Sequence, residues 1–475
     1  MCIIMKLPQE FEKRMCRMLG DEYPAFRLSY SQESRQALRL NPKKAKWDFL
    51  GKVPFSLSPV PWAKDGYYYA KDDAPGKHPY HEAGVYYIQE PSAMAPVEYL
   101  DVQPGERILD LCAAPGGKST QIAAKMQGKG ILICNEMHPA RAKILSENIE
   151  RMGICNGIVT NETPECLLER FEAYFDKILV DAPCSGEGMF RKNEAACTEW
   201  SLETVRQCAA RQDAILSCAA KMLKPGGRLV YSTCTFAPEE NEGSISRFLE
   251  CFPDFEILPV QKTEGMTGGN PLWYAGASDH IEDTIRFFPH KLGGEGHYLA
   301  VLLKRGIGQN EDFPIREEKG LSQKECGEYL KFAEENLKEM PEGIYLAFGD
   351  RLYLAPKGTP ILKGLKVLRP GLHLGDNKKN RFEPSHALAL FLNQNMVRRS
   401  IDFPSDSREI LAYLEGQTIS SEGEKGWYLI TTDGYAIGWG KLSGGMMKNH
   451  YPKGLRKKLT VPAKTARSET CRQPE

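Results

Sequence analysis

The sequence predicts an α/β fold, in which a central and mostly parallel sheet is covered by helices on both faces. Three observations lead to this prediction. From about residue 107, short apolar runs rich in Ile, Leu and Val alternate with helical stretches. Polar motifs follow several of these runs directly, as expected where strands end. A late run of alternating apolar residues, HYLAVLLKR, is typical of an antiparallel strand at the edge of such a sheet.

The predicted strands and helices of this sheet follow one another along the chain. In order they are RILDLCA, KSTQIAAKMQ, ILICNE, PARAKILSENIERMG, GIVTN, KILVDAP, a helix from Leu202 to Leu223, and RLVYSTC. A helix, NEGSISRFLECF, and a strand, FEILPV, come before the antiparallel edge. This order is typical of a Rossmann-like domain of the S-adenosylmethionine-binding type, which we place at residues 96–305.

The regions before and after this domain differ in character. The N-terminal part combines a charged amphipathic helix, a Pro-rich extended stretch and the tyrosine run of residues 67–69. After Arg305, the polar segment GIGQNEDFPIREEKG indicates a linker. Beyond it, hairpins are predicted with turns at Gly349-Asp350 and Asp433-Gly434. We expect an N-terminal cap (1–95), a first C-terminal domain (320–384), a mostly β module (385–460) and a basic tail (461–475).

Composition excludes several classes of protein. The 62 Lys and Arg residues balance 62 Asp and Glu residues, so any nucleic-acid site must be local rather than a property of the whole charge. No segment resembles a secretory signal or approaches 18 consecutive apolar residues, which predicts a soluble, cytoplasmic protein without membrane contact. The fourteen cysteines form no CxxC pair, so we expect reduced thiols and neither disulfides nor a metal site.

A candidate nucleoside site lies in the segment LDLCAAPGGKS, from Leu109 to Ser119. It places Asp110 at a strand end, then a Pro-Gly-Gly turn, then a helix, at the sheet edge where open α/β folds bind nucleotides. The segment is neither GxGxxG nor a P-loop, which disfavours phosphate binding. Glu136, which ends the next strand 26 positions after Asp110, is where a ribose-binding carboxylate is expected.

Two cysteines fall just past strand ends on the same predicted edge. Cys184 lies in DAPCSGEGMFRK after the strand KILV, and Cys234 lies in STCTFAPEENE after the strand RLVY. A random cysteine is more often a buried, inert thiol. Two cysteines in turns after buried strands, one preceded by Asp181-Ala-Pro, indicate active-site thiols instead.

The motifs AAPGGKS, DAPCSG and STCT, in this order, resemble the Nol/Nop/Sun family of RNA cytosine-C5 methyltransferases over roughly residues 85–305. The resemblance implies a Rossmann-like S-adenosylmethionine-dependent methyltransferase domain. It implies that Cys234 is the nucleophile that adds to cytosine C6, that Cys184 assists breakdown of the adduct, and that Asp181 bonds the cytosine edge.

The same resemblance places Lys118 near the methyl-transfer centre and Arg141 near the cofactor or base. With the residues of the glycine turn, the cofactor-binding set is Asp110, Cys112, Ala113, Ala114, Pro115, Gly116, Gly117, Lys118, Glu136, Arg141 and Asp181. Relatives often have an aspartate after the third strand to meet the adenine. Here the run is VTNETPE, so Asn161, Glu162 or Thr163 would have to serve.

The C-terminal segments RPGLHLGDNKKNRFEPSHALAL and DGYAIGWGK resemble the α+β extension of the RsmF-like bacterial branch, which ends in a PUA-like RNA-binding module. The resemblance implies methylation of 16S ribosomal RNA. The sequence leaves open whether free RNA or the assembling 30S subunit is the substrate, and a monomer is our default expectation. Transfer RNA is the nearest competing substrate. A non-catalytic RNA-binding factor and a DNA cytosine methyltransferase with Cys184 of Pro183-Cys184 as nucleophile are alternatives from other classes.

Because a nucleophile cannot reach C6 of a stacked base, the target cytosine must be unpaired or flipped out. The segment Phe190 to Lys192 and the N-terminal tyrosines are candidates for stacking on RNA and for phosphate contacts. Ordinary packing is the competing interpretation of these residues.

Overall fold

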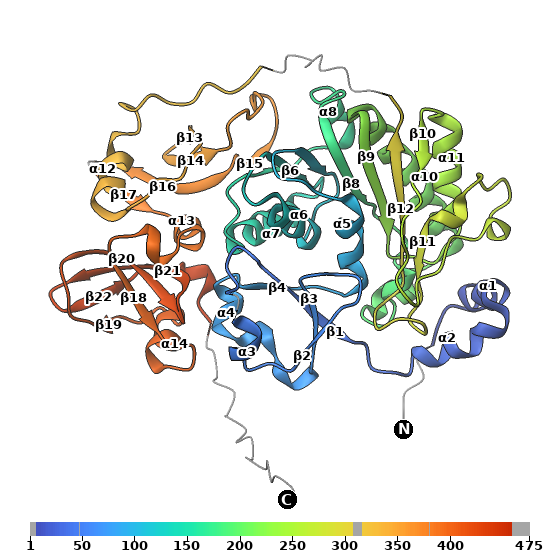
Figure 1. The fold of residues 1–475 in the computed structure, drawn as a ribbon, viewed down its shortest axis with the longest axis horizontal. Coiled ribbons are helices and arrows are strands. Elements are labelled where there is room, and N and C mark those ends of the chain that lie inside the picture. The colour runs from blue at the N-terminus through green and yellow to red at the C-terminus, as the bar shows by residue number, and fades with distance from the viewer. Residues whose placement is uncertain (1–5, 47, 307–315, 380, 458–475) are drawn as a thin grey trace, which may run out of the picture.

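The central sheet has nine strands in the order β10-β12-β9-β8-β5-β6-β7-β15, with β11 paired to β12 (Figure 1). The computed structural model describes residues 6–46, 48–306, 316–379 and 381–457. The strands of this sheet are β5 (Arg107–Asp110), β6 (Ile131–Asn135), β7 (Gly157–Thr160), β8 (Phe175–Asp181), β9 (Leu223–Thr233), β10 (Phe255–Ile257), β11 (Ile285–Phe287), β12 (His297–Lys304) and β15 (Val367–Arg369).

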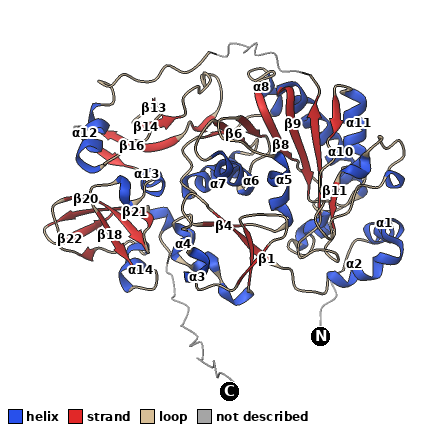
Figure 2. Cartoon of the chain, in the orientation of Figure 1, coloured by secondary structure: helices blue, strands red, loops and turns tan. Residues whose placement is uncertain are grey.

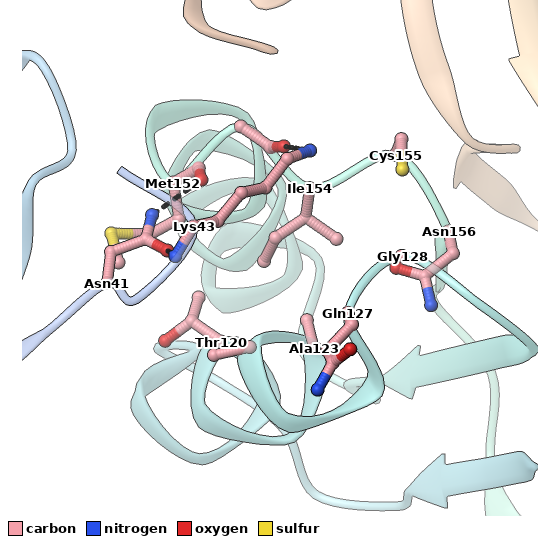
Figure 3. A pocket seen from close by; sticks show the side chains of 12 residues that line it. Asn41, Lys43, Thr120, Ala123, Gln127, Gly128, Met152, Ile154, Cys155 and Asn156 are labelled. Atoms are coloured by element: carbon pink, nitrogen blue, oxygen red, sulfur yellow. Dashed lines mark hydrogen bonds between the residues drawn. The ribbon is translucent and has the colours of Figure 1, made fainter. Parts of the chain in front are cut away.

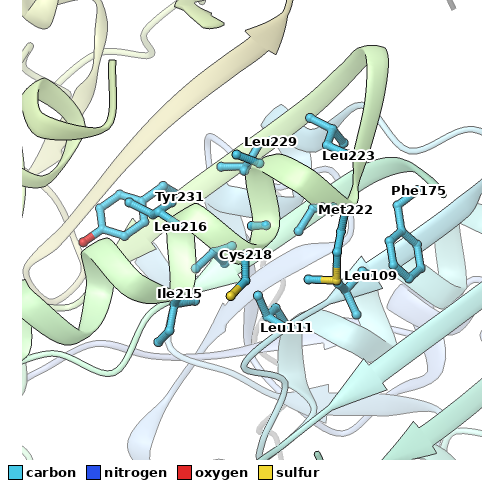
Figure 4. Close-up of a cluster of buried hydrophobic side chains, with 14 of the residues drawn as sticks. Leu109, Leu111, Phe175, Ile215, Leu216, Cys218, Met222, Leu223, Leu229 and Tyr231 are labelled. Atoms are coloured by element: carbon cyan, nitrogen blue, oxygen red, sulfur yellow. The ribbon is translucent and has the colours of Figure 1, made fainter. Parts of the chain in front are cut away.

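Helices cover both faces of the sheet, as predicted (Figure 2). One face carries α5 (Ala95–Leu100), α6 (Gly117–Met126) and α7 (Pro139–Arg151), and the other carries α8 (Pro164–Leu168), α10 (Leu202–Met222) and α11 (Glu242–Cys251). The side chains of each strand alternate between the two faces. Ile108 packs with the first group and Leu109 with the second, where Figure 4 shows it facing Met222 of α10.

The strand order brings the functional motifs to one place. β5 pairs in parallel with β6 on one side and with β8 on the other. The strand order therefore reverses at β5, and such a reversal leaves a crevice at the carboxyl ends of these strands. The predicted antiparallel edge is confirmed, since β12 runs antiparallel to β9 with Tyr298 opposite Thr233. The opposite edge was not predicted, because β15 comes from the first C-terminal region and pairs antiparallel with β7.

The N-terminal region forms a four-stranded sheet and a helical hairpin. The sheet has the order β2-β3-β1-β4, and the tyrosine run lies in β3 (Gly66–Tyr69). The other elements are α1 (Gln9–Leu19), α2 (Tyr23–Ser29), β1 (Gln36–Leu40), α3 (Phe49–Lys52), β2 (Leu57–Pro59), α4 (Pro79–Glu82) and β4 (Tyr86–Ile88). Phe11 of α1 packs edge-on against Phe190, at a centroid distance of 5.1 Å, and thereby covers the loop that follows Cys184.

The C-terminal region contains two further sheets, and both predicted hairpins are confirmed. Phe348 faces Arg351 across the first turn, and Thr432 faces Tyr435 across the second. One sheet has the order β13-β14-β16-β17, and the other has the order β18-β20-β21-β22-β19. Their elements are α12 (Gly327–Asn336), β13 (Ile344–Phe348), β14 (Arg351–Ala355), β16 (Leu372–Lys378), β17 (Arg381–Pro384), α13 (His386–Phe391), β18 (Ser400–Phe403), α14 (Arg408–Leu414), β19 (Ile419–Ser420), β20 (Gly426–Thr432), β21 (Tyr435–Ser443) and β22 (Met446–Asn449).

The last sheet shares a hydrophobic core with the N-terminal region. Tyr80 and Tyr86 lie in one buried cluster with Ile430 and Ile437. The hydroxyl of Tyr80 also donates to Asp433 Oδ2 at 2.8 Å. The C-terminal module is therefore docked on the N-terminal region. Most of the predicted linker (307–315) and the predicted basic tail (461–475) lie outside the described residues.

A small cavity of about 30 Å³ marks a second junction, where the N-terminal region meets α6 and α7 (Figure 3). Nδ2 of Asn41 donates to the carbonyl of Met152 at 3.0 Å across it. Lys43 Nζ donates to the carbonyl of Gly153 at 3.4 Å. A space of this size holds about one water molecule and is too small for a nucleotide.

Removal of residues 400–475 should destabilise the rest of the chain rather than only delete a binding module. The truncation exposes the apolar side chains that the N-terminal region contributes to the shared core. We expect a melting temperature lower by roughly 5 °C or more and increased binding of a hydrophobic dye. Melting at the full-length temperature would show that the two regions are thermodynamically independent.

Candidate active site

A cavity of about 370 Å³ opens at the carboxyl ends of β5, β6, β8 and β9. It is far larger than the cavity near Asn41 and contains both thiols singled out in the sequence. The lining residues are Leu111, Cys112, Ala114, Asn135, Glu136, Met137, His138, Arg141, Pro164, Asp181, Ala182, Pro183, Cys184, Arg211, Ile215 and Cys234. This volume is within the range of small-molecule sites.

The two thiols lie side by side. Sγ of Cys184 is 3.3 Å from Sγ of Cys234, and both side chains are half-buried. The hydrogen bond with Cys234, together with burial, holds the pKa of the Cys184 thiol well above its ordinary value. Cys184 therefore keeps its proton more firmly than an ordinary thiol.

Two buried carboxylates fix the loops that carry these thiols. Glu240 accepts hydrogen bonds from the backbone N–H of Ser185 at 3.0 Å and from Gln212 Nε2 at 2.8 Å. Glu187 accepts from the backbone N–H of Phe236 at 3.1 Å and pairs with Arg14 of α1. Each carboxylate thus joins the loop after Cys184 to a neighbouring element.

Asp181, at the end of β8, is the hub of a polar cluster. Its Oδ2 accepts from Lys118 Nζ at 2.7 Å, and its Oδ1 accepts from the hydroxyl of Ser232 at 2.7 Å. Burial alone would raise the pKa of Asp181, but the Lys118 ammonium and these hydrogen bonds outweigh burial and hold the pKa below its ordinary value. Asp181 is therefore an anion that accepts hydrogen bonds at neutral pH.

His297, which the sequence analysis did not single out, completes this cluster. Its Nε2 lies 3.9 Å from Asp181 Oδ1 and has no hydrogen-bond partner among the described residues. Burial, reinforced by the nearby Lys118 charge, lowers the pKa of His297 to about 4. The imidazole is therefore neutral at pH 7, and Lys118 makes the largest favourable contribution to the ionised form of Asp181.

The other end of the cavity carries the predicted ribose-binding carboxylate. Glu136 is 3% exposed, and its Oε2 lies 3.3 Å from Nη1 of Arg141. Nη2 of Arg141 donates to the carbonyl of Ala114 at 2.8 Å. Arg141 thus connects the turn after β5 with the end of β6.

Asp110 is fully buried beside this end. Its Oδ2 accepts from the hydroxyl of Ser119 at 2.6 Å, whereas its Oδ1 has no partner among the described residues. Burial raises its pKa to about 7. Asp110 therefore lies next to the cavity without lining it, and its hydrogen bond with Ser119 joins the end of β5 to the start of α6.

The predicted cofactor residues divide into two groups. Cys112, Ala114, Glu136, Arg141 and Asp181 line the cavity. The others are not among the residues that line it, and they are Asp110, Ala113, Pro115, Gly116, Gly117 and Lys118.

The two glycines act through packing. A Cβ on Gly116, where φ is 113°, would lie 3.1 Å from a methyl group of Leu145, and one on Gly117 would lie 3.3 Å from the ring of Tyr87. They let the turn pack closely against α7 and the N-terminal region, and so hold the wall of the cavity in place.

The candidates for contact with adenine are engaged elsewhere. The side-chain amide of Asn161 donates to the carbonyl of Glu136 at 2.7 Å, and Glu162 accepts from the backbone N–H of Lys366 at 2.6 Å. Thr163 accepts from the N–H of Cys166 at the start of α8. Pro164, the next residue, lines the cavity instead.

The segment after Cys184 packs within the protein. Phe190 is completely buried, and Arg191 donates to Glu295 Oε2 at 2.8 Å and to the carbonyl of Ser29 at 2.8 Å. The packing interpretation therefore replaces stacking on RNA for Phe190. The segment holds α2 against the loop before β12.

Several lining residues carried no recognisable signal in the sequence. Met137 and His138 follow Glu136 directly and could have been found as its neighbours. Arg211 and Ile215 lie on α10, whose sequence pattern does not differ from that of a helix packed on a core. The described residues contain no group of three or more His, Cys, Asp or Glu side chains placed to hold a metal ion. None of the described helices is both long and apolar enough to cross a membrane.

The carboxyl group of Glu240 should make stability depend on pH. Burial raises its pKa from 4.5 to about 7, so the folded protein holds this proton more tightly than the unfolded chain does. The stabilisation is complete below about pH 4.5 and is lost as the pH rises through 7, with an upper limit of about 3 kcal/mol. In urea titrations, E240Q should lack this part of the fall between pH 5 and 8. Identical pH dependence in both proteins would refute the assignment.

Four family models match consecutive parts of the chain. The model of 16S rRNA methyltransferase RsmB/F matches residues 97–303, and the N-terminal domain of 16S rRNA methyltransferase RsmF matches residues 7–91. The RsmF first C-terminal domain matches residues 331–392, and the RsmF PUA domain matches residues 400–457.

Curated relatives match over nearly the whole length. The chain is 30% identical to ribosomal RNA small subunit methyltransferase F of Vibrio cholerae, over 95% of this chain and 98% of that protein. It is 32% identical to the protein of the same name from Vibrio vulnificus, over 94% of this chain and 97% of the relative.

Among solved structures, a methyltransferase homolog protein from Pyrococcus horikoshii matches with a TM-score of 0.55 and 29% identity, over 63% of this chain and 96% of that chain. NSun6 from the same organism, solved with SFG, matches with a TM-score of 0.54 over 64% of this chain and 100% of that chain. At 21% identity, the second likeness shows the fold alone.

Proposed function

Because the chain belongs to the RsmF family of 16S rRNA methyltransferases, we propose that it transfers a methyl group from S-adenosylmethionine to C5 of a cytosine in small-subunit ribosomal RNA. The observation that carries the cytosine-C5 assignment is the thiol pair, with Sγ atoms 3.3 Å apart, beside the Asp181 carboxylate. Methyl transfer to an amine or hydroxyl of RNA would need no thiol nucleophile.

A thiol nucleophile is needed because C5 of cytosine is a poor nucleophile. C5 of cytosine is too electron-poor to attack a methyl donor unaided. Addition of the Cys234 thiolate to C6 makes C5 a nucleophilic, enamine-like carbon. After methylation, loss of the C5 proton and expulsion of the thiolate restore the aromatic ring. S-adenosylmethionine, when bound, supplies the electrophilic methyl group.

The surroundings of the two thiols support a division of roles. Cys184 has a pKa held well above its ordinary value and therefore stays protonated beside Cys234. The two sulfur atoms are 3.3 Å apart, so a protonated Cys184 would donate to the Cys234 sulfur and steady the thiolate as it leaves C6. We assign Cys234 as the nucleophile and Cys184 as the group that assists its release.

Asp181 and Lys118 form the polar part of the proposed mechanism. The Asp181 carboxylate would share a proton with N3 at the cytosine edge, and that proton offsets the negative charge that develops at N3 as the thiolate adds to C6. Lys118, 2.7 Å from Asp181, keeps that carboxylate ionised and oriented before the base arrives. We propose Asp181 as the cytosine-binding residue and Lys118 as its positioning partner.

The wall between Asp110 and Arg141 suits the cofactor. The carboxylate of Glu136 would accept from the ribose hydroxyls, and Asp110 would support this end of the site through its hydrogen bond with Ser119. Met137, 46% exposed and beside Glu136, offers an apolar surface for the adenine ring. Cys112 is a neutral wall residue, because burial raises its pKa.

RNA is favoured over the alternatives from other classes. The Pro183-Cys184 dipeptide permits a DNA-type nucleophile, but the matches to 16S rRNA methyltransferases favour RNA as the substrate. A purely binding protein would not need two adjacent thiols in a cavity with a paired carboxylate and ammonium.

Substitution of the two cysteines should separate their roles. C234A is expected to lose methyl transfer by at least about a thousandfold, because no adduct can form. C184A should form the adduct with RNA but release it slowly, and should therefore accumulate as a covalent complex on a denaturing gel. C166A is the matched control, since this exposed thiol lies outside the cavity. Retained turnover in C234A would overturn the assignment.

The substrate class is tested by offering 30S subunits, free 16S ribosomal RNA and bulk transfer RNA in parallel with labelled S-adenosylmethionine. Nucleoside analysis should detect 5-methylcytidine in small-subunit RNA. Label in transfer RNA alone would keep the mechanism and discard the substrate. Label in another nucleoside would discard the cytosine-C5 chemistry.

A further inference from the structure

We propose that Arg211 binds a backbone phosphate of the RNA next to the target nucleotide, an inference that rests on the function proposed above. Two arginines line the cavity. Arg141 is held by Glu136 and by the carbonyl of Ala114. Arg211 is exposed, and its guanidinium makes no hydrogen bond or ion pair within the part of the chain that the structure describes.

The backbone of Arg211 is held beside the thiols. Its neighbour Gln212 is fully buried and donates through Nε2 to the carbonyl of Pro183 at 3.1 Å and to Glu240 at 2.8 Å. Pro183 directly precedes Cys184. The backbone at Arg211 is therefore held in place at the thiol end of the cavity, whereas its guanidinium makes no hydrogen bond or ion pair with the described residues.

The direction of α10 places Arg211 at the mouth. The helix ends at Met222, where β9 begins at the amino edge of the sheet, so its earlier turns lie toward the carboxyl edge. Ile215, one turn further along, lines the same cavity more deeply and is 5% exposed. Arg211, which is exposed, thus lies nearer to solvent than Ile215 at the same cavity.

The chemistry of the substrate explains a free guanidinium at this place. A flipped nucleotide turns about its backbone, so its flanking phosphates stay at the mouth of the pocket that takes the base. Asp181 and Glu136 inside the cavity would repel these phosphates. The planar guanidinium can bind a phosphate through two parallel hydrogen bonds and offset that repulsion. Arg211 would then distinguish a polynucleotide from a free nucleoside.

The test compares R211Q with R206Q in the full-length protein, using unmodified 16S ribosomal RNA as substrate. Arg206 lies on the same helix, its side chain is 72% exposed, and it pairs with Glu203 outside the cavity. For R211Q, the KM for RNA should rise roughly tenfold, with kcat at saturating RNA within about twofold of wild type. R206Q should match wild type in both.

Salt dependence gives a second readout that a merely structural change would not move. The slope of log(kcat/KM) against log salt should become shallower by about 0.7 in R211Q and should be largely restored in R211K, which keeps the charge. An unchanged KM and slope in R211Q, or equal changes in R206Q, would overturn the proposal. A fall in S-adenosylmethionine affinity instead would assign Arg211 to the cofactor.

The experiments distinguish failure of the proposed function from failure of the Arg211–phosphate contact. If wild-type protein forms no 5-methylcytidine in ribosomal RNA, the proposed function is wrong. If wild type is active and R211Q is indistinguishable from it, only the phosphate contact is wrong.

Discussion

The proposed chemistry depends on hydrogen bonds that keep the loop carrying Cys184 at a fixed distance from the loop carrying Cys234. Glu187 and Glu240 are both completely buried, and each accepts backbone N–H groups from loops that carry Cys184 or Cys234. The N–H of Gly188 donates to the carbonyl of Cys234 at 2.8 Å and joins the loops directly. Reacting groups must be held within a fraction of an ångström, and buried carboxylates with several donors provide that rigidity.

The sheet determines which of these groups can meet. Asp181 and Ser232 end neighbouring parallel strands, and their registered pairing brings the carboxylate within 2.7 Å of the hydroxyl. Lys118, in the first turn of α6, donates to the same carboxylate. The cluster therefore depends on three segments far apart in sequence, and a change of register in β8 or β9 would separate it.

Much of this arrangement could be predicted from local patterns. The parallel strands, the antiparallel edge at β12 and both hairpins have strong periodicity or a Gly-Asp or Asp-Gly turn, and the cysteines follow strand ends. The sequence could not show β15, because three residues of an edge strand carry no period. His297 and Arg211 were missed for a related reason. Their roles come from neighbours across the fold, whereas locally they belong to a strand and a helix.

The docking of the C-terminal module, also unpredicted, changes how RNA recognition should work. Tyr451 of this module donates to Glu82 at 3.0 Å, and aromatic residues of the N-terminal region fill the shared core. A module held in this way cannot search for RNA as one on a flexible linker would. Contacts with the module and with the cavity would act at one fixed spacing, so an RNA of matching shape gains from both, whereas an RNA of another shape gains from only one. Selection of the target would then depend on RNA shape as much as on the cytosine itself.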